Sequence, residues 1–244
     1  MIQSKLKYIY GPVYSWRMGM SLGIDPITTS KKICNFDCIY CQLGRTTQFY
    51  TERENFVAVE DILKEINSLP PVKIDYYTFS GRGEPTLAKN LGAMIQAVGD
   101  LTKGKVAVIT NAALIDQQDV QQDLMLADLV LAKLDACDEE SLKAVDIPAG
   151  EINIKAIIDG IKSFKKKYKG KLALQIMFIK ENKQYARSIA EIARDIGPDE
   201  IQINTPLRPG GIPLNETDLA EIKKYFKGLP AMTVYEMERR NVEP

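Results

Sequence analysis

Short apolar runs alternate with segments of helical spacing along the chain after about residue 55. Five β-branched runs are nearly continuously apolar, as strands covered on both faces are. They predict strands over 73–80, 105–110, 128–135, 172–179 and 200–207. Apolar residues at helical spacing predict helices over 59–66, 154–164 and 189–196. Asp116 and Asn182 are candidate N-caps, and Gly197-Pro198 predicts the end of the last helix.

Strands that alternate with helices predict an α/β fold with a parallel sheet and right-handed crossovers. A further strand over 27–33 would give six βα units, short of the eight of a full barrel of about 250 residues. An open, partial barrel and a doubly wound sheet are the two candidates, and both place a ligand site at the carboxyl ends of the strands. Residues 1–25 predict an irregular lead-in. No repeat or linker divides the chain, so 1–244 is expected to form a single domain.

Charge and composition exclude several classes of function. The 32 basic and 32 acidic side chains balance, which removes the bulk electrostatic argument for a nucleic-acid or membrane-surface protein. No run approaches the roughly 18 apolar residues of a membrane span, and the N terminus lacks a signal-peptide pattern. A cytoplasmic protein without a membrane partner is therefore expected. The sequence contains no histidine, which excludes a Ser-His-Asp triad, a Cys-His pair and a His-containing zinc site.

Three of the four cysteines, Cys34, Cys38 and Cys41, lie together directly after the predicted strand over 27–33. In a cytoplasmic protein, clustered thiols are more often metal ligands or redox groups than structural disulfides. A structural zinc site needs four protein ligands, and only Cys137 remains to complete one. Three closely spaced thiolates instead suit a 4Fe-4S cluster in which one iron lacks a protein ligand and stays open to a substrate or cofactor.

The spacing of these cysteines, with the aromatic Tyr40 before the third, resembles the C-x-x-x-C-x-aromatic-C motif of the radical S-adenosylmethionine (SAM) superfamily. The resemblance implies a partial (βα)6 TIM-like barrel and a 4Fe-4S cluster on Cys34, Cys38 and Cys41, with SAM at the open iron. In that family an electron from the cluster cleaves SAM to methionine and a 5'-deoxyadenosyl radical, which abstracts a hydrogen atom from the substrate. Tyr40 is then expected near the adenine.

A glycine-rich turn after the predicted strand over 73–80 extends the resemblance. The run Gly81-Arg82-Gly83-Glu84-Pro85 is similar to the family's G-x-G-E-P turn, whose backbone meets the SAM amino group. Glycines allow a main chain to approach a ligand closely. A dinucleotide fingerprint is excluded, because Thr86 stands where its third glycine would be. The resemblance therefore assigns cofactor binding to Gly81, Gly83, Glu84 and Pro85.

Longer matches look like the branch of the superfamily related to wyosine-tRNA synthases. They include Ser21 to Asp25, Thr110-Asn111 and Asn204 to Pro209. Those enzymes carry a further cysteine triad near the N terminus for a second cluster. This chain has no cysteine before Cys34, so their tRNA activity is not expected to carry over.

Polar side chains also stand at or near the ends of the later predicted strands. Such groups are costly to bury without partners, so they either line a site or satisfy one another. Asn111 and Asp135 are candidates for the ribose hydroxyls of SAM, and Lys133 or Arg208 for its carboxylate or an anionic substrate. A structural ion pair is the alternative for Lys133 and Asp135. The other members of this group are Thr110, Gln175 and Asn204.

The sequence thus predicts a radical SAM enzyme whose substrate, an RNA base, a peptide or a small metabolite, is left open. An external electron donor is an expected partner, because nothing in the chain resembles a flavin or nicotinamide site. The alternative from another class is a non-catalytic iron-sulfur or zinc protein that transfers electrons or serves as a scaffold. Cys137 is either a small buried residue or a thiol with a role in hydrogen transfer or in a further cluster.

Overall fold

The computed structural model describes residues 6–236, whose strands form one eight-stranded sheet in the order of the chain. The strands are β1 (Ile9–Ser15), β2 (Gly19–Ile24), β3 (Tyr76–Phe79), β4 (Lys105–Thr110), β5 (Leu129–Lys133), β6 (Lys171–Met177), β7 (Glu200–Asn204) and β8 (Ala231–Thr233). β1 and β2 are antiparallel, and every later neighbouring pair is parallel. Within the described residues β1 does not pair with β8, so the sheet is open between its two edges.

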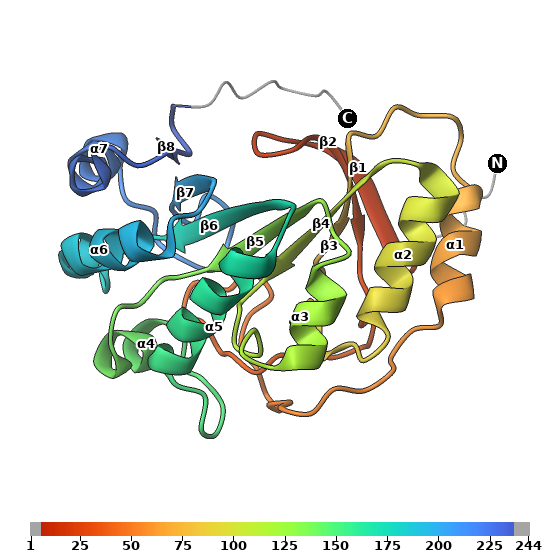
Figure 1. The fold of residues 1–244 in the computed structure, drawn as a ribbon, viewed down its shortest axis with the longest axis horizontal. Coiled ribbons are helices and arrows are strands. Elements are labelled where there is room, and N and C mark those ends of the chain that lie inside the picture. Colours follow the sequence, from red (N-terminus) through yellow and green to blue (C-terminus); the bar gives the residue numbers. More distant parts are fainter. Residues whose placement is uncertain (1–5, 237–244) are drawn as a thin grey trace.

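Helices connect the consecutive parallel strands. They are α1 (Val59–Asn67), α2 (Leu91–Thr102), α3 (Gln118–Leu124), α4 (Glu139–Val145), α5 (Ile154–Lys167), α6 (Ala186–Ile196) and α7 (Glu216–Lys223). They follow one another around the outside of the sheet, from α1 at the right of Figure 1 to α7 at the left. Six βα units, from β2 with α1 to β7 with α7, form the predicted partial barrel, and β8 is a short addition.

The amphipathic pattern of α5 shows how the sequence builds these units. Its apolar residues recur at helical spacing, and Ile157, Ile161 and Phe164 are buried against the sheet. The Asn153 side chain caps the first turn by accepting a hydrogen bond from the backbone N–H of Ala156 at 2.9 Å. Three lysines occupy the last turn, where they complement the helix dipole.

The sheet buries different side chains on its two faces. The outer face packs large residues such as Leu22, Phe79 and Ile203 against the helices. We call the inner side of the sheet the lumen, and the apolar cluster on this side includes two alanines. That cluster consists of Met18, Ala107, Leu129, Leu131 and Ala173.

The irregular lead-in expected over residues 1–25 is wrong where the structure describes it. Residues 9–24 form the β1–β2 hairpin, in which Leu22 and Ile24 are buried against the helices while Ser21 lies on the inner face. Gly11 and Pro12 fall at an irregularity in the β1–β2 pairing, where a proline is tolerated. The expectation for residues 1–5 lies outside the described residues.

The strand expected over 27–33 is also wrong, because β2 takes its place in the sheet. The Asp25 carboxylate accepts hydrogen bonds from the backbone N–H groups of Ile27 and Thr28, both at 3.1 Å. This local bonding folds the chain after Pro26 into a turn rather than a strand. The five other predicted strands are confirmed, with shifts of no more than a few residues at their ends.

Of the two predicted N-caps, Asp116 precedes no helix directly, whereas Asn182 is the N-cap residue of the 3-10 helix Lys183–Tyr185 that leads into α6, although its side chain makes no capping bond there. α3 starts after Gln117, one residue beyond Asp116, without a side-chain cap. The Asn182 amide instead donates to the carbonyl groups of Asp135 and Met177, both at 2.9 Å, and so ties together the segments that follow β5 and β6. The predicted end of α6 is confirmed, because Gly197 adopts a left-handed conformation with a φ of 64°.

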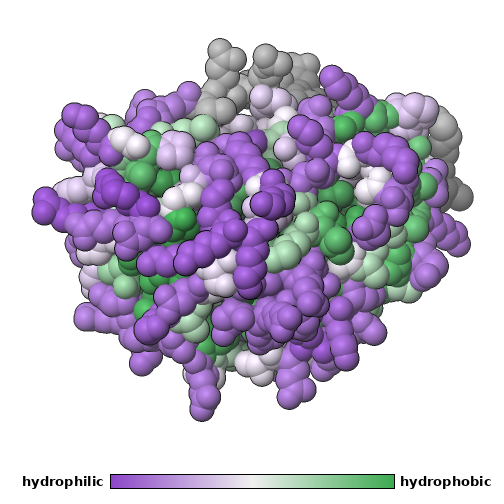
Figure 2. All heavy atoms as spheres, viewed as in Figure 1, coloured by the Kyte–Doolittle hydropathy of each residue, from purple (hydrophilic) through white to green (hydrophobic). Residues whose placement is uncertain are grey.

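The face of the molecule in Figure 2 is mostly hydrophilic, and its apolar areas are small and separate. The longest helix of the described residues is α5, with 14 residues. None of the helices described is long and apolar enough to cross a membrane.

Candidate active site

A cavity of about 230 Å³ lies at the carboxyl ends of the parallel strands. Its walls include residues at the ends of β4, β5 and β6 and residues directly after β3. Nine of the eleven predicted site residues line it, and Pro85 and Asp135 do not. The nine are Cys34, Cys38, Tyr40, Cys41, Gly81, Gly83, Glu84, Asn111 and Lys133. The structure therefore brings two motifs that are distant in the sequence to one place.

The cysteine loop, residues 33–50, is held in shape by a buried aspartate that the motif did not reveal. Asp37 accepts a hydrogen bond from the backbone N–H of Thr46 at 2.6 Å and pairs with Arg45 at 2.7 Å. The Thr46 hydroxyl donates to the carbonyl of Phe36 at 2.7 Å. These bonds close the loop on itself, so that its three thiols reach the same cavity. The sequence signal for this role was the position of an acidic residue, Asp37, between Cys34 and Cys38.

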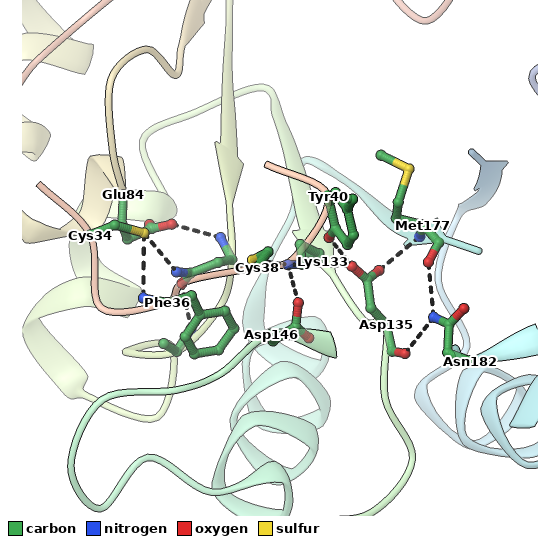
Figure 3. A network of polar contacts seen from close by, with 12 residues as sticks. Cys34, Phe36, Cys38, Tyr40, Glu84, Lys133, Asp135, Asp146, Met177 and Asn182 are labelled. Carbon is green, nitrogen blue, oxygen red and sulfur yellow. Dashed lines mark hydrogen bonds and ion pairs between the residues drawn. The ribbon is translucent and has the colours of Figure 1, made fainter. Parts of the chain in front are cut away.

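Lys133 at the end of β5 joins the cysteine loop to the sheet (Figure 3). Its Nζ lies 3.0 Å from Cys38 Sγ, 2.6 Å from Asp146 Oδ1 and 3.3 Å from Asp135 Oδ2. An ammonium group has three donors, and these partners account for all of them. The ion-pair alternative for Lys133 and Asp135 is therefore present, and the contact of Lys133 with the SAM carboxylate stays a prediction. Asp146 carries no motif, and its role was missed.

Burial and charge oppose each other at the thiols. Burial raises the pKa of Cys34 to about 11 and that of Cys38 well above its usual value. The positive charge of Lys133 counters the effect at Cys38. Metal binding requires thiolates, so Lys133 is the group of this chain that favours the ligating form of Cys38.

Glu84 of the glycine-rich turn is a buried anchor. Its Oε1 accepts hydrogen bonds from the backbone N–H and the hydroxyl of Thr86 and from the hydroxyl of Thr110, at 3.0, 2.7 and 2.6 Å. Its Oε2 accepts one from the backbone N–H of Asn111 at 2.7 Å. Burial raises the pKa of Glu84, while these donors oppose the shift. The carboxyl group thus fixes the ends of two strands around the cavity.

The Asn111 side chain has partners within the protein, and its contact with the SAM ribose stays a prediction. Its amide Nδ2 donates to Asn35 Oδ1 at 2.7 Å and lies 3.8 Å from Cys34 Sγ. Its Oδ1 accepts a hydrogen bond from the backbone N–H of Ala113 at 3.0 Å. Asn111 therefore connects the end of β4 to the first cysteine.

Two glycines of the turn are required by the close approach of other chain segments. A Cβ atom on Gly83 would lie 1.7 Å from the carbonyl oxygen of Ile33, which pairs with this turn. Gly81 has a φ of 117°, and a Cβ atom there would meet the Asp25 carboxyl group at 2.5 Å. The turn can therefore pass directly behind the cysteine loop.

The two predicted residues that do not line the cavity have supporting positions. Pro85 is buried at the start of the 3-10 turn Pro85–Leu87. Asp135 is buried, accepts hydrogen bonds from the Tyr40 hydroxyl and, at 2.7 Å, from the backbone N–H of Met177. Asp135 therefore holds the Tyr40 hydroxyl at the cavity wall, and its contact with the SAM ribose stays a prediction.

The remaining candidates fall into two groups. Thr110 and Gln175 line the cavity, whereas Asn204, Arg208 and Cys137 are not among its lining residues. Cys137 is half-buried near Asp138 and Ser141 at the start of α4. It is a free thiol separate from the cysteine loop.

Comparison with known proteins agrees with this geometry. The sequence matches the Radical SAM superfamily over residues 29–193. The chain belongs to the radical SAM superfamily. Among its relatives is the UPF0026 protein slr1464 of Synechocystis, 40% identical over 202 residues that cover 82% of this chain and 76% of the relative. A probable GTP 3',8-cyclase of Saccharolobus islandicus is 26% identical over 205 residues, covering 82% and 63%.

The fold of this radical SAM enzyme is similar to that of Streptococcus suis SuiB in a crystal structure with bound S-adenosylmethionine. The TM-score is 0.64 at 16% sequence identity, and the match covers 86% of this chain and 52% of SuiB. This chain therefore spans about half the length of that structure.

Membership in the radical SAM superfamily implies SAM and a 4Fe-4S cluster as cofactors, and the donor set fits them. The three thiols are free and line one cavity. Within the described part of the chain, no three Cys, Asp or Glu side chains converge closely enough to hold a single metal ion. A cluster accepts each thiolate at a different iron, so it does not require the three thiols to converge on one point.

Proposed function

We propose that this protein reductively cleaves SAM at a 4Fe-4S cluster held by Cys34, Cys38 and Cys41. One observation carries the proposal: the three cysteines and the turn of Gly81 and Gly83 line a single cavity. When bound, the cluster and SAM would supply a 5'-deoxyadenosyl radical that takes a hydrogen atom from the substrate.

The residues of the chain would perform the positioning. Lys133 stabilises the thiolate of Cys38, and Asp135 holds the Tyr40 hydroxyl. Gly81 and Gly83 bring backbone groups to the cavity wall, where they can meet the SAM amino group. These contacts support the role of a fixed platform for the cofactors.

The test is anaerobic. The protein is reconstituted with iron and sulfide, SAM and a strong reductant are added, and 5'-deoxyadenosine is quantified. Product is expected from the wild type and not from a Cys38→Ala variant.

A Cys137→Ala variant is the matched control, because this thiol does not line the cavity. It should form as much product as the wild type. A loaded cluster that neither binds nor cleaves SAM would contradict the proposal and favour an iron-sulfur protein that only carries electrons.

We further propose an external electron donor and a reducing, cytoplasmic setting. Four free cysteines in the described residues support a reducing compartment. The substrate class stays open between an RNA base, a peptide and a small metabolite. We do not assign the tRNA activity of the wyosine branch to this chain. Retention on tRNA that weakens steeply with salt would favour RNA.

A further inference from the structure

The turn of the β1–β2 hairpin covers part of the lumen. Met18 of this turn packs with Ala107, Leu131 and Ala173 on the inner face of the sheet. The Thr78 hydroxyl lies 3.6 Å from Met18 Sδ. The turn is therefore anchored on the inner side, at the open edge of the barrel.

Arg17, next to Met18, carries a buried charge for which the described residues provide no hydrogen-bond acceptor. Its Nε and Nη1 atoms are both buried, and neither has a hydrogen-bond partner. Its guanidinium lies 5.4 Å from the ring centroid of Trp16, and this aromatic ring carries no negative charge to neutralise the guanidinium. Burial lowers the pKa of Arg17 to about 10, and the positive charge of Arg208 adds to this effect. A guanidinium in this state is costly unless an anion meets it.

The acidic group that acts on Arg17 is already engaged. The charge of Glu200 at the start of β7 partly stabilises Arg17. However, Glu200 Oε2 pairs with Lys171 at 2.5 Å, and its Oε1 accepts a hydrogen bond from Gln202 Nε2 at 2.6 Å. Among the residues that the structure describes, Arg17 therefore has no dedicated carboxylate.

Polar residues of β7 and β6 lead, by strand register, from the side of Gln202 to the wall of the cavity. Gln202 of β7 is 1% exposed, and its Oε1 has no hydrogen-bond partner. It lies in register with Gln175, which in turn is in register with Lys133, and both of these line the cavity. Arg208, in the loop after β7, lies at the rim with its Nη1 3.4 Å from Gln42 Oε1.

We propose that the lumen between the hairpin turn and β7 is the substrate pocket, and that it takes a small molecule by an oxyanion, a phosphate or a carboxylate, held by Arg17 with Arg208 at the rim. The inference deepens the proposed function and rests on it. An oxyanion would give the orphaned guanidinium nitrogens charge-assisted hydrogen bonds. The unpartnered oxygen of Gln202 would accept from a hydroxyl or amine of the same molecule. Because the pocket adjoins the cysteine cavity, the rest of the substrate would reach the site of the radical.

The chain contains one tryptophan, Trp16, directly beside Arg17. The cluster-loaded protein is titrated with inorganic phosphate and, separately, with acetate. Calorimetry gives the affinity, and Trp16 fluorescence reports whether binding occurs next to Arg17. Saturable binding of at least one anion with a change in fluorescence is expected, and the tighter of the two identifies the oxyanion.

Variants then locate the site. Arg17→Gln should weaken anion binding by about tenfold or more. Arg208→Gln, at an exposed position, should weaken it by about two- to fivefold without affecting folding. Arg194→Gln, on the exposed side of α6, is the matched control and should bind as the wild type does. Thermal unfolding checks that each variant is folded.

The outcomes separate this inference from the proposed function. No saturable binding of either anion, or equal losses in the Arg17 and Arg194 variants, would overturn the inference, even if 5'-deoxyadenosine forms. If Arg17→Gln does not fold, the result for Arg208→Gln decides. Specific anion binding in a protein that does not bind SAM would leave an anion site but overturn the proposed function and, with it, the pocket's role in radical chemistry.

Discussion

The Nζ of Lys133 lies 3.0 Å from Cys38 Sγ and 2.6 Å from Asp146 Oδ1, so one buried cation joins a thiol of the cysteine loop to a carboxylate. The three groups come from three different segments: the end of β5, the cysteine loop and the segment after α4. The charge at this junction favours the thiolate form of Cys38, and it ties that thiol to the sheet.

Replacing Lys133 by methionine should shift the reduction potential of the cluster to a more negative value. The variant removes a positive charge and a hydrogen bond from a ligand sulfur, and both stabilise the reduced cluster. A redox titration followed by electron paramagnetic resonance measures the shift. Lys155→Met, at an exposed position of α5, is the control and should leave the potential unchanged. An unchanged potential in the Lys133 variant would show that the contact is lost when the cluster binds.

The same Lys133→Met variant should lower the free energy of unfolding of the cluster-free protein by about 3 kcal/mol, because it leaves two buried carboxylates without their cation. Urea unfolding provides the measurement. Adding Asp146→Asn should recover part of the loss, since it removes one of the unpaired charges. A double variant that is less stable than the single one would contradict this reading of the pair.

The Glu84→Gln variant should lower the free energy of unfolding by about 2 kcal/mol. Glu84 accepts four hydrogen bonds with its two oxygens. In the glutamine variant the amide NH2 group would face one or more of these donors, and the hydrogen bonds to it would be lost. Denaturant unfolding checks the value. Glu221→Gln, at an exposed position of α7, should change stability by less than about 0.5 kcal/mol. Equal effects of the two substitutions would mean that the anchor is dispensable.

The stability of the cluster-free protein should depend on pH through Asp135. Burial raises the pKa of Asp135 to about 6, above the value of about 3.9 in an unfolded chain. The native state therefore binds the proton more tightly, and this contribution is fully present below about pH 4 and is lost as the pH rises to about 6. The stability of the wild type relative to Asp135→Asn should fall by about 3 kcal/mol across that window and then stay level. A difference that grows with pH would show that the pairing with Lys133 outweighs burial.

Two glycine substitutions should have opposite effects. Gly83→Ala would place a Cβ atom 1.7 Å from the Ile33 carbonyl oxygen and should destabilise the protein by about 3 kcal/mol or more. It should also abolish SAM binding, because the turn must move. Gly99→Ala in α2 meets only Val106, at 3.9 Å, and should stabilise by about 0.5–1 kcal/mol. Thermal unfolding of both variants, with calorimetric titration of SAM, tests the pair.

The sequence predicted helices and strands correctly where the local apolar pattern reflects burial in the fold. The strand over 105–110 and the starts of α1 and α5 were placed to the residue, because apolar spacing there directly records which face is buried. The hairpin at residues 9–24 was missed because its inner side carries small and polar residues, which blur the alternation.

For the site, the cysteine and glycine motifs identified the residues that meet in the cavity. Their partners could not be found in the same way. Asp146 pairs with Lys133 only because the segment after α4 folds back beneath the cysteine loop, where it also receives the backbone N–H of Asp37. Contacts of this kind depend on the tertiary structure and leave no spacing in the sequence.

The order of the sheet, in which each strand pairs with its neighbours along the chain, also has a consequence during synthesis. A growing chain can add one βα unit after another without waiting for a distant strand, and folding from the N terminus is common in nascent chains. The cysteine loop emerges early, but it gains Lys133 and Asp146 only later. The loop after β7, where a Cβ atom on Gly210 would lie 2.8 Å from the Cys41 carbonyl oxygen, closes over it last. The three thiols are therefore enclosed by their partners only late in synthesis.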